Sequence, residues 1–228
     1  MRNTLPAKLI VVEGIDGAGK STLLTNLEAA LAAELPVRRV TKSTVASAHP
    51  SLTGYLTRLN DLLYKREDGV GALLGERYWL FAMASWYTAL YEQVIQPTLA
   101  DGVHVLLDNS PYKLVARMLV GSDVDADLVR ACYAGLREPD LTVLLDVSPE
   151  VALARKQGHS TLEAGHDTSE NAFVSHQNNV RQQLVDMAGQ HDWLVMDVAE
   201  ADPAQLLREV IPAVHRVLHG QPASAGCR

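Results

Sequence analysis

The residues that most clearly carry chemistry lie near the start of the chain, where a glycine-rich run ends in a lysine and two hydroxyl residues. An apolar segment, Leu9 to Val12, comes directly before this run. Glycine permits backbone angles closed to other residues, so successive N–H groups can converge on one anion. Lys20 adds a positive charge and Ser21 a hydroxyl ligand for Mg²⁺. The run therefore predicts a P-loop that binds ATP through Gly14, Ile15, Asp16, Gly17, Ala18, Gly19, Lys20, Ser21 and Thr22.

Acidic residues at the ends of apolar runs are the second set of candidates. Asp108 follows the run Val103 to Leu107, and we expect it to hold Mg²⁺ through water or to accept the proton of a substrate hydroxyl. The alternative for Asp108 is a cap for the helix that begins at Pro111. Glu13 and Asp16 lie beside and inside the predicted P-loop, where a carboxylate can instead hold the backbone of the loop.

The elements that would position these residues follow from the hydrophobic pattern. Short apolar runs alternate with helical stretches, and the runs are almost continuously apolar, which is typical of strands buried on both faces. The expected strands are Leu9 to Val12, Val37 to Thr41, Val103 to Leu107, Leu141 to Leu145 and Trp193 to Met196. This pattern predicts an α/β protein with a P-loop NTPase fold, in which helices cover both faces of a five-stranded parallel sheet. Ligands bind at the carboxyl edge of such a sheet.

The helical stretches complete the expected organisation. They are Lys20 to Glu34, Leu52 to Tyr64, Gly71 to Gln96, Pro111 to Val120, Asp125 to Leu136, Pro149 to Gln157, Ser169 to Ala188 and Pro203 to Leu218. Residues 158–168 lack periodicity, which favours either a short lid over the phosphate site or a plain surface connection. We expect one P-loop domain over residues 1–219 and a disordered tail over residues 220–228.

Composition limits the partners. The chain has 228 residues and a formal net charge of -7, and no long basic run is present, so neither a nucleic acid nor an anionic membrane is an expected partner. Its two cysteines lack metal or redox spacing, and its eight histidines are scattered. No apolar stretch approaches about 18 residues. These features favour a soluble protein of the reducing cytoplasm.

Two classes of P-loop protein carry further motifs that this chain lacks. A regulatory GTPase carries an Asn-Lys-x-Asp run that reads guanine, and a transporter ATPase carries Leu-Ser-Gly-Gly. With a single P-loop and a candidate lid, the remaining class is a small-molecule kinase that transfers a phosphoryl group.

Two blocks of sequence resemble the thymidylate kinase family. Residues 12–22 are similar to the P-loop of that family, including Glu13-Gly14 at its start and Asp16 within it. Residues 139–150 and the following Arg155 are similar to its fourth-strand signature. Leu80-Phe81-Ala82 and residues 94–102 give weaker support. The similarity spans nearly the whole chain.

The resemblance implies a nucleoside monophosphate kinase that uses ATP and Mg²⁺ and phosphorylates dTMP or a similar nucleotide. It implies that Asp16 approaches the sugar hydroxyl of the acceptor, that Phe81 stacks on its base, and that Arg155 reaches the phosphates. The expected catalytic residues are then Lys20, Asp108 and Arg155. The expected substrate residues are Asp16, Phe81 and Asp108, and the expected Mg²⁺ ligands are Ser21 and Asp108. A homodimer through the long aromatic helix is also implied.

The acceptor half of the chain departs from the family. Neutral Asn109 and Ser85 stand where the family has arginines, Lys42 replaces another, and His159 stands where a further arginine is expected. Arginine binds phosphate through two N–H groups at once, which neutral side chains cannot replace.

Three functions therefore remain open. The first is a kinase of a nucleotide, with Arg77, Lys113 or Lys42 supplying the missing charge. The second is a kinase that acts on a hydroxyl group of a nucleoside or another unphosphorylated metabolite. The third is a regulatory protein that binds ATP without phosphoryl transfer.

Overall fold

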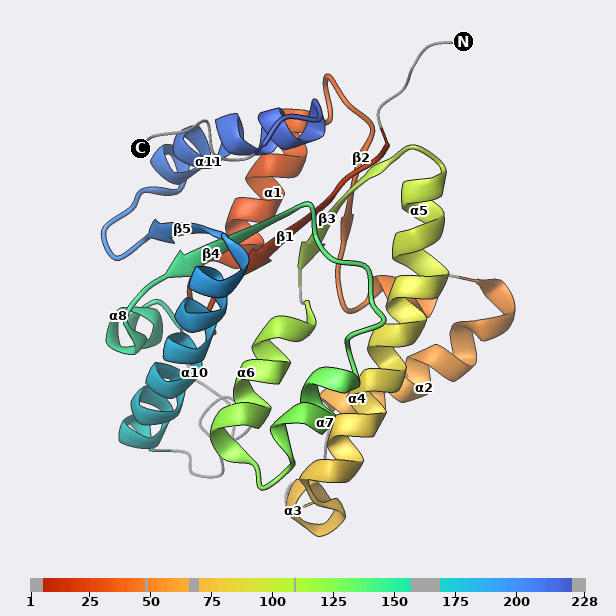
Figure 1. Ribbon diagram of the computed structural model, residues 1–228, viewed down its shortest axis with the longest axis vertical. Coiled ribbons are helices and arrows are strands. Elements are labelled where there is room, and N and C mark those ends of the chain that lie inside the picture. Colours follow the sequence, from red (N-terminus) through yellow and green to blue (C-terminus); the bar gives the residue numbers. More distant parts are fainter. Residues whose placement is uncertain (1–5, 48, 66–69, 109, 157–168, 223–228) are drawn as a thin grey trace.

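A computed structural model describes residues 6–47, 49–65, 70–108, 110–156 and 169–222 (Figure 1). Its centre is a sheet of five parallel strands in the order β2-β3-β1-β4-β5. The strands are β1 (Leu9–Glu13), β2 (Val37–Val40), β3 (His104–Asp108), β4 (Leu141–Asp146) and β5 (Leu194–Asp197). The predicted α/β fold and all of its predicted strands are confirmed, with ends that differ by one residue.

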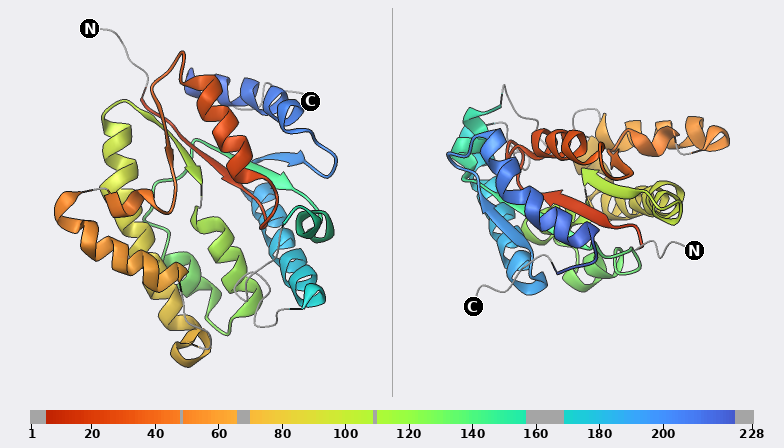
Figure 2. Two further views of the ribbon diagram at one scale, coloured as in Figure 1. Left: turned by 180° about the vertical axis from the view of Figure 1, so that it is seen from behind. Right: turned by 90° about the horizontal axis from the view of Figure 1, so that it is seen from above.

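Helices cover both faces of the sheet (Figure 2). They are α1 (Lys20–Leu31), α2 (Thr53–Tyr64), α3 (Val70–Leu74), α4 (Glu76–Leu90), α5 (Gln96–Ala100), α6 (Pro111–Gly121), α7 (Ala126–Ala131), α8 (Pro149–Ala154), α10 (Glu170–His191) and α11 (Pro203–Leu218). Two 3-10 turns, Thr44–Ser47 and Pro50–Leu52, follow β2.

The two faces of the sheet carry separate hydrophobic cores, which is why the three central strands β1, β3 and β4 are almost entirely buried, whereas the edge strands β2 and β5 are only partly buried. Every residue of β1 is buried. Its side chains alternate between faces. Ile10 and Val12 belong to one core with residues of α1 and α11, whereas Leu9 and Val11 belong to the other with residues of α4. Burial on both sides fixes β1 in the middle of the sheet, so the loop that follows it lies at the centre of the carboxyl edge.

The long helix expected over residues 71–96 is wrong in detail. Gly75 has φ +76°, a left-handed conformation that ends α3 before α4 begins. After α4, the turn Tyr91–Ile95 is π-helical and leads into α5, where Pro97 lacks the N–H that a regular helix would use. The helix expected over residues 125–136 is likewise shorter, and only α7 forms there.

Two expected segments fall partly or wholly outside this description. The lid proposed for residues 158–168 lies outside the described residues, as does most of the tail proposed for residues 220–228. Within the described part of the chain, every helix is too short or too polar to span a bilayer.

Candidate functional site

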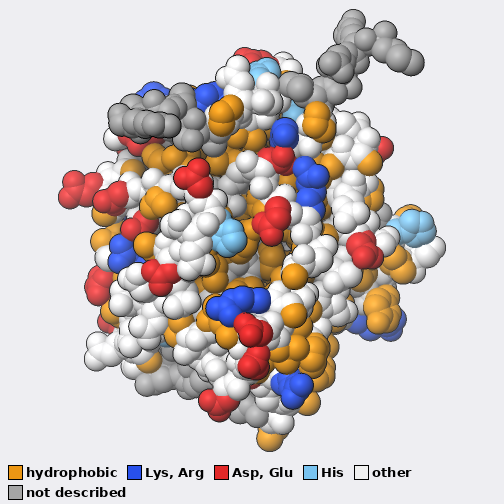
Figure 3. All heavy atoms as spheres, in the orientation of Figure 1, with side chains coloured by type: hydrophobic (Ala, Val, Ile, Leu, Met, Phe, Trp, Pro, Cys, Tyr) orange, Lys and Arg blue, Asp and Glu red, His pale blue; other side chains and the backbone are white. Residues whose placement is uncertain are grey.

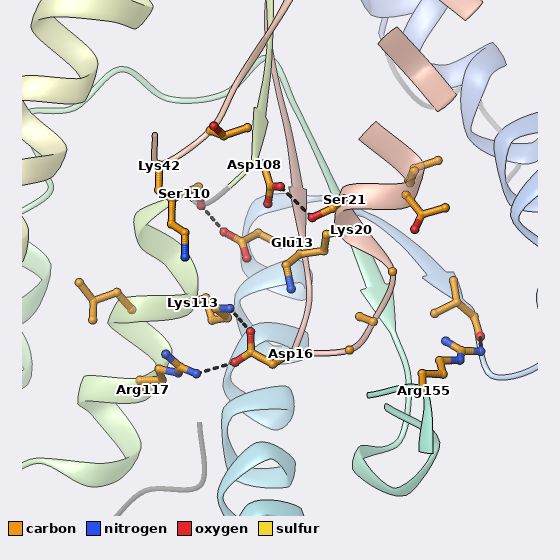
Figure 4. A pocket seen from close by; sticks show the side chains of 18 of the residues that line it. Glu13, Asp16, Lys20, Ser21, Lys42, Asp108, Ser110, Lys113, Arg117 and Arg155 are labelled. Atoms are coloured by element: carbon orange, nitrogen blue, oxygen red, sulfur yellow. Dashed lines mark hydrogen bonds and ion pairs between the residues drawn. The ribbon is translucent and has the colours of Figure 1, made fainter. Parts of the chain in front are cut away.

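A cavity of about 870 Å³ opens at the carboxyl edge of the sheet, where β1 and β3 end and α1 and α6 begin (Figure 4). The glycine-rich loop forms one side, and α6 with the end of α4 forms the other. The charged side chains that line it include Asp16, Lys20, Lys42, Asp108, Lys113 and Arg117. The topology thus brings the predicted P-loop and a second group of cations to one cavity.

The glycine-rich loop has the backbone shape that its sequence predicts. Gly14, Gly17 and Gly19 all have positive φ, at +145°, +93° and +96°. Gly17 also packs directly against α8, because a Cβ at this position would lie 2.5 Å from the carbonyl oxygen of Ala152. Backbone conformation and close packing therefore both require glycine here.

Lys20 opens α1 and lies against the loop that precedes it. Its Nζ donates hydrogen bonds to the carbonyl oxygens of Gly14 and Ile15, each at 2.8 Å. Burial and the nearby charge of Lys113 together lower the pKa of Lys20 to about 8, although Asp16, Glu13 and Asp108 oppose this shift. An ammonium has three N–H groups, so one remains to bind an oxyanion.

Ser21 and Asp108 form an oxygen pair at the end of β3. The hydroxyl of Ser21 donates to Oδ2 of Asp108 at 2.9 Å, and Arg39 from β2 donates to the same oxygen at 3.2 Å. Asp108 does not cap α6, because Ser110 is the N-cap residue and accepts from the Tyr112 amide. The helix-cap alternative for Asp108 is therefore wrong. Sequence patterns gave no indication of Arg39, whose contact spans 69 residues.

Glu13, at the end of β1, forms part of the cavity floor. Its side chain is buried and accepts a hydrogen bond from the hydroxyl of Ser110. Burial raises the pKa of Glu13, although Ser110, Lys20 and Lys113 oppose this shift.

Asp16 lies inside the loop and is held by two cations from α6. Lys113 Nζ lies 2.7 Å from Oδ1 of Asp16, and Arg117 Nη2 lies 2.6 Å from its Oδ2. Burial alone would raise the pKa of Asp16, but Lys113, Arg117 and Lys20 hold it well below its usual range. Arg117 was not among the sequence candidates, although its position four residues after Lys113 puts both on one helix face.

Tyr64, Met83 and Tyr87 form one apolar part of the cavity lining. Phe81 lies outside that lining, and 47% of its surface is exposed. Met83 and Tyr87 are four residues apart and share a face of α4, whereas Phe81 is two residues from Met83 and points about 200° away from it around the helix. Ser85 is also exposed on α4.

Two further candidates lie apart from the loop. Arg155, just after α8, lines the cavity and donates through Nη2 to the carbonyl oxygens of Val198 and Ala199 at 2.7 and 2.9 Å. Arg77 is exposed on α4, outside the cavity lining as the described residues form it. Asn109 lies outside the described residues.

A central parallel sheet, with a glycine-rich loop that runs from its middle strand into a helix beginning at Lys20, defines a class: this is a P-loop NTPase fold. The particular family follows from sequence comparison. The family model for thymidylate kinase matches residues 12–210. The chain belongs to the thymidylate kinase family.

Individual relatives agree with this assignment. The chain is 29% identical over 213 residues to a thymidylate kinase of Bdellovibrio bacteriovorus, a match that covers 91% of this chain and 95% of the relative. It is 28% identical over 221 residues to one of Vibrio campbellii, covering 95% of this chain and the whole relative. A thymidylate kinase of Legionella pneumophila is 32% identical over 157 residues, covering 67% and 70%.

Proposed function

We propose that this protein is an ATP-dependent kinase that transfers the γ-phosphoryl group of ATP to dTMP or a closely similar nucleotide. The observation that carries this proposal is the single cavity in which a P-loop faces a second group of cations, Lys113 and Arg117. A kinase of a phosphorylated acceptor needs two adjoining anion sites, one for the donor and one for the acceptor. Membership of the thymidylate kinase family supports the nucleotide acceptor.

In the donor half, the loop amides and Lys20 would hold the β- and γ-phosphates. Ser21 and Asp108 supply the oxygen ligands that Mg²⁺ prefers, and their 2.9 Å separation fits two ligands, direct or through water, at one ion. Bound Mg²⁺ would neutralise charge on the transferred group. Arg155 would release its carbonyl partners and turn toward the phosphates, as the resemblance implies.

In the acceptor half, Asp16 would approach the sugar of the acceptor. The attacking phosphate oxygen of a nucleotide is already ionised at neutral pH, so Asp108 would accept a proton only from a hydroxyl acceptor. Tyr64, Met83 and Tyr87 offer an apolar surface for a base. Phe81 could reach that base only after a movement of α4. The cations of this half favour an anionic acceptor over an unphosphorylated metabolite. The P-loop, with Lys20 and Asp108 both in place, favours a kinase over a regulatory protein that binds ATP without phosphoryl transfer.

The proposal is tested by ATP consumption on purified protein with dTMP, dUMP and thymidine. We expect turnover with dTMP, and we expect Lys20→Ala to reduce kcat by about 10²–10³-fold or more, because it removes a charge from the transition state. Arg130→Gln, an exposed residue of α7 paired with Asp127, is the matched control and should leave turnover unchanged. Absence of turnover with every nucleotide, while ATP still binds, would contradict the proposal.

We also propose one kinase domain over residues 1–219 and a homodimer. Six large apolar side chains are exposed on α2, α3 and α4, and we call them the apolar face: Tyr55, Leu62, Leu73, Leu74, Tyr78 and Phe81. Figure 3 shows hydrophobic side chains gathering over this region, at the lower right. Soluble monomers rarely expose contiguous apolar patches of more than a few hundred Å². A second copy of this chain would cover the patch.

A further inference from the structure

Two cations of α6 converge on one carboxylate beside the P-loop (Figure 4). Lys113 and Arg117 are one helical turn apart, and both side chains end on Asp16. Only 16% of each side chain is exposed, so these are charges largely removed from water. One carboxylate balances only one of them. The other positive charge lacks a counterion in this contact, which is costly for a group that water can scarcely reach.

The donors of this pair are not all used. Nε of Arg117 is buried and has no hydrogen-bond partner among the described residues. A buried N–H without an acceptor is destabilising, and it is often found where a ligand supplies the acceptor. The planar guanidinium matches the oxygens of a phosphate through two parallel hydrogen bonds. Arg117 therefore presents an unfilled position for an oxyanion.

A third cation reaches the same cavity from another element. Lys42 follows β2, lines the cavity, and lies with its Nζ 4.9 Å from the ring centre of Tyr64. Lys42, Lys113 and Arg117 thus bring three positive charges to the cavity, and Asp16 pairs with two of them. A phosphate monoester, which carries nearly two negative charges at neutral pH, suits such a group of cations.

We propose that Lys113 and Arg117 form the binding site for the phosphate of the acceptor. The acceptor is then a nucleoside monophosphate and not a nucleoside. In this chain, α6 takes over the role of the arginines that the family has at the positions of Ser85 and Asn109. Asp16 occupies the cations while the acceptor is absent and competes with its phosphate. This inference rests on the proposed function for the kind of acceptor, but its test does not depend on turnover.

The test measures equilibrium binding of dTMP and of thymidine by calorimetry, and its readout is the ratio of the two affinities. Contacts to base and sugar are common to both ligands and cancel in this ratio, so it reports the phosphate alone. We expect wild-type protein to prefer dTMP by more than about tenfold. Arg117→Gln and Lys113→Met should each reduce the ratio about tenfold, whereas Arg117→Lys, which keeps the charge, should retain part of it.

Asp16→Asn separates ligand binding from a purely structural role. If the cations bind phosphate, removing their competitor raises the ratio of dTMP to thymidine affinity. If they serve only to hold Asp16, then Asp16→Asn leaves the ratio unchanged, and so do the variants of Lys113 and Arg117. Arg130→Gln should leave the ratio at the wild-type value. ATP binding by each variant shows that it is folded.

The outcomes are distinct. The inference is overturned if wild-type protein shows no preference for dTMP, or if the ratio in Arg117→Gln and Lys113→Met stays within about twofold of wild type. If the preference for dTMP is present and depends on Arg117 but no ADP forms, the proposed function fails and the phosphate site stands. If dTMP is phosphorylated with an unchanged ratio in both variants, the function stands and this inference fails.

Discussion

The surroundings of Lys20 disfavour its charged form and lower its pKa. Burial and repulsion from Lys113 lower its pKa to about 8, compared with 10.5 for an ordinary lysine. Both effects oppose the charged form in the ligand-free protein. A polyphosphate that enters the loop supplies the missing negative charge, so binding and protonation of Lys20 are coupled.

ATP affinity should therefore fall as the pH rises through about 8. The charged form of Lys20 dominates below its pKa in the folded protein and is lost above it. At higher pH, Lys20 must therefore take up a proton when ATP binds, which weakens the observed affinity. We expect binding in excess Mg²⁺ to be about tenfold weaker at about pH 9 than at about pH 7. Titration calorimetry across this range measures the change. Lys20→Arg should remove the pH dependence, because arginine stays charged throughout.

At the scale of elements, the P-loop packs closely against β4 and α8. Gly14 approaches the carbonyl oxygen of Leu145 in β4, and Gly17 approaches that of Ala152 in α8, at distances that leave no room for a Cβ. Gly19 has a similar positive φ, but nothing lies within 4 Å of the position that its Cβ would take. Gly14 and Gly17 are thus required by both backbone angle and close packing, whereas Gly19 is required by its backbone angle alone.

This difference predicts the result of two alanine substitutions. Gly19→Ala should lower the free energy of unfolding by about 1–2 kcal/mol, because alanine is strained at positive φ. Gly17→Ala carries the same strain and should cost about 1–3 kcal/mol more, since its Cβ meets the backbone of α8. Urea unfolding of the two variants measures the difference. Equal losses would show that the contact with α8 relaxes freely.

At the scale of the whole molecule, the apolar face is the main surface feature away from the cavity. It spans α2, α3 and α4, and the opposite faces of α2 and α4 contribute buried residues to one core. A change on this face can therefore affect assembly without touching the P-loop, which lies on the other side of the cavity.

We expect the protein to sediment as a dimer and Leu73→Glu to shift it to monomer. Leu73 is 86% exposed, so the substitution should change the stability of the monomer by less than about 0.5 kcal/mol. Val195→Glu replaces an exposed apolar residue on β5, away from the apolar face, and should leave the dimer intact. A wild-type monomer at all concentrations tested would rule out this assembly.

The sequence by itself determined the fold and the donor half of the site. Five runs predicted five strands, and the signal is clearest for the three central ones, because a strand buried on both faces is apolar along most of its length. The edge strands β2 and β5 are only partly buried. The glycine-rich loop was equally readable, since its residues are contiguous and their backbone angles depend on local residue type. Neither inference required knowledge of distant contacts.

Only the tertiary structure decided what faces the loop. Asp16 meets Lys113 and Arg117 across 97 and 101 residues, and no local pattern marks such a contact. The same holds for Phe81, which the resemblance assigns to the acceptor base but which the rotation of α4 leaves outside the cavity lining. Periodicity shows which residues share a helix face. The direction of that face is set by the packing of the whole helix against its neighbours.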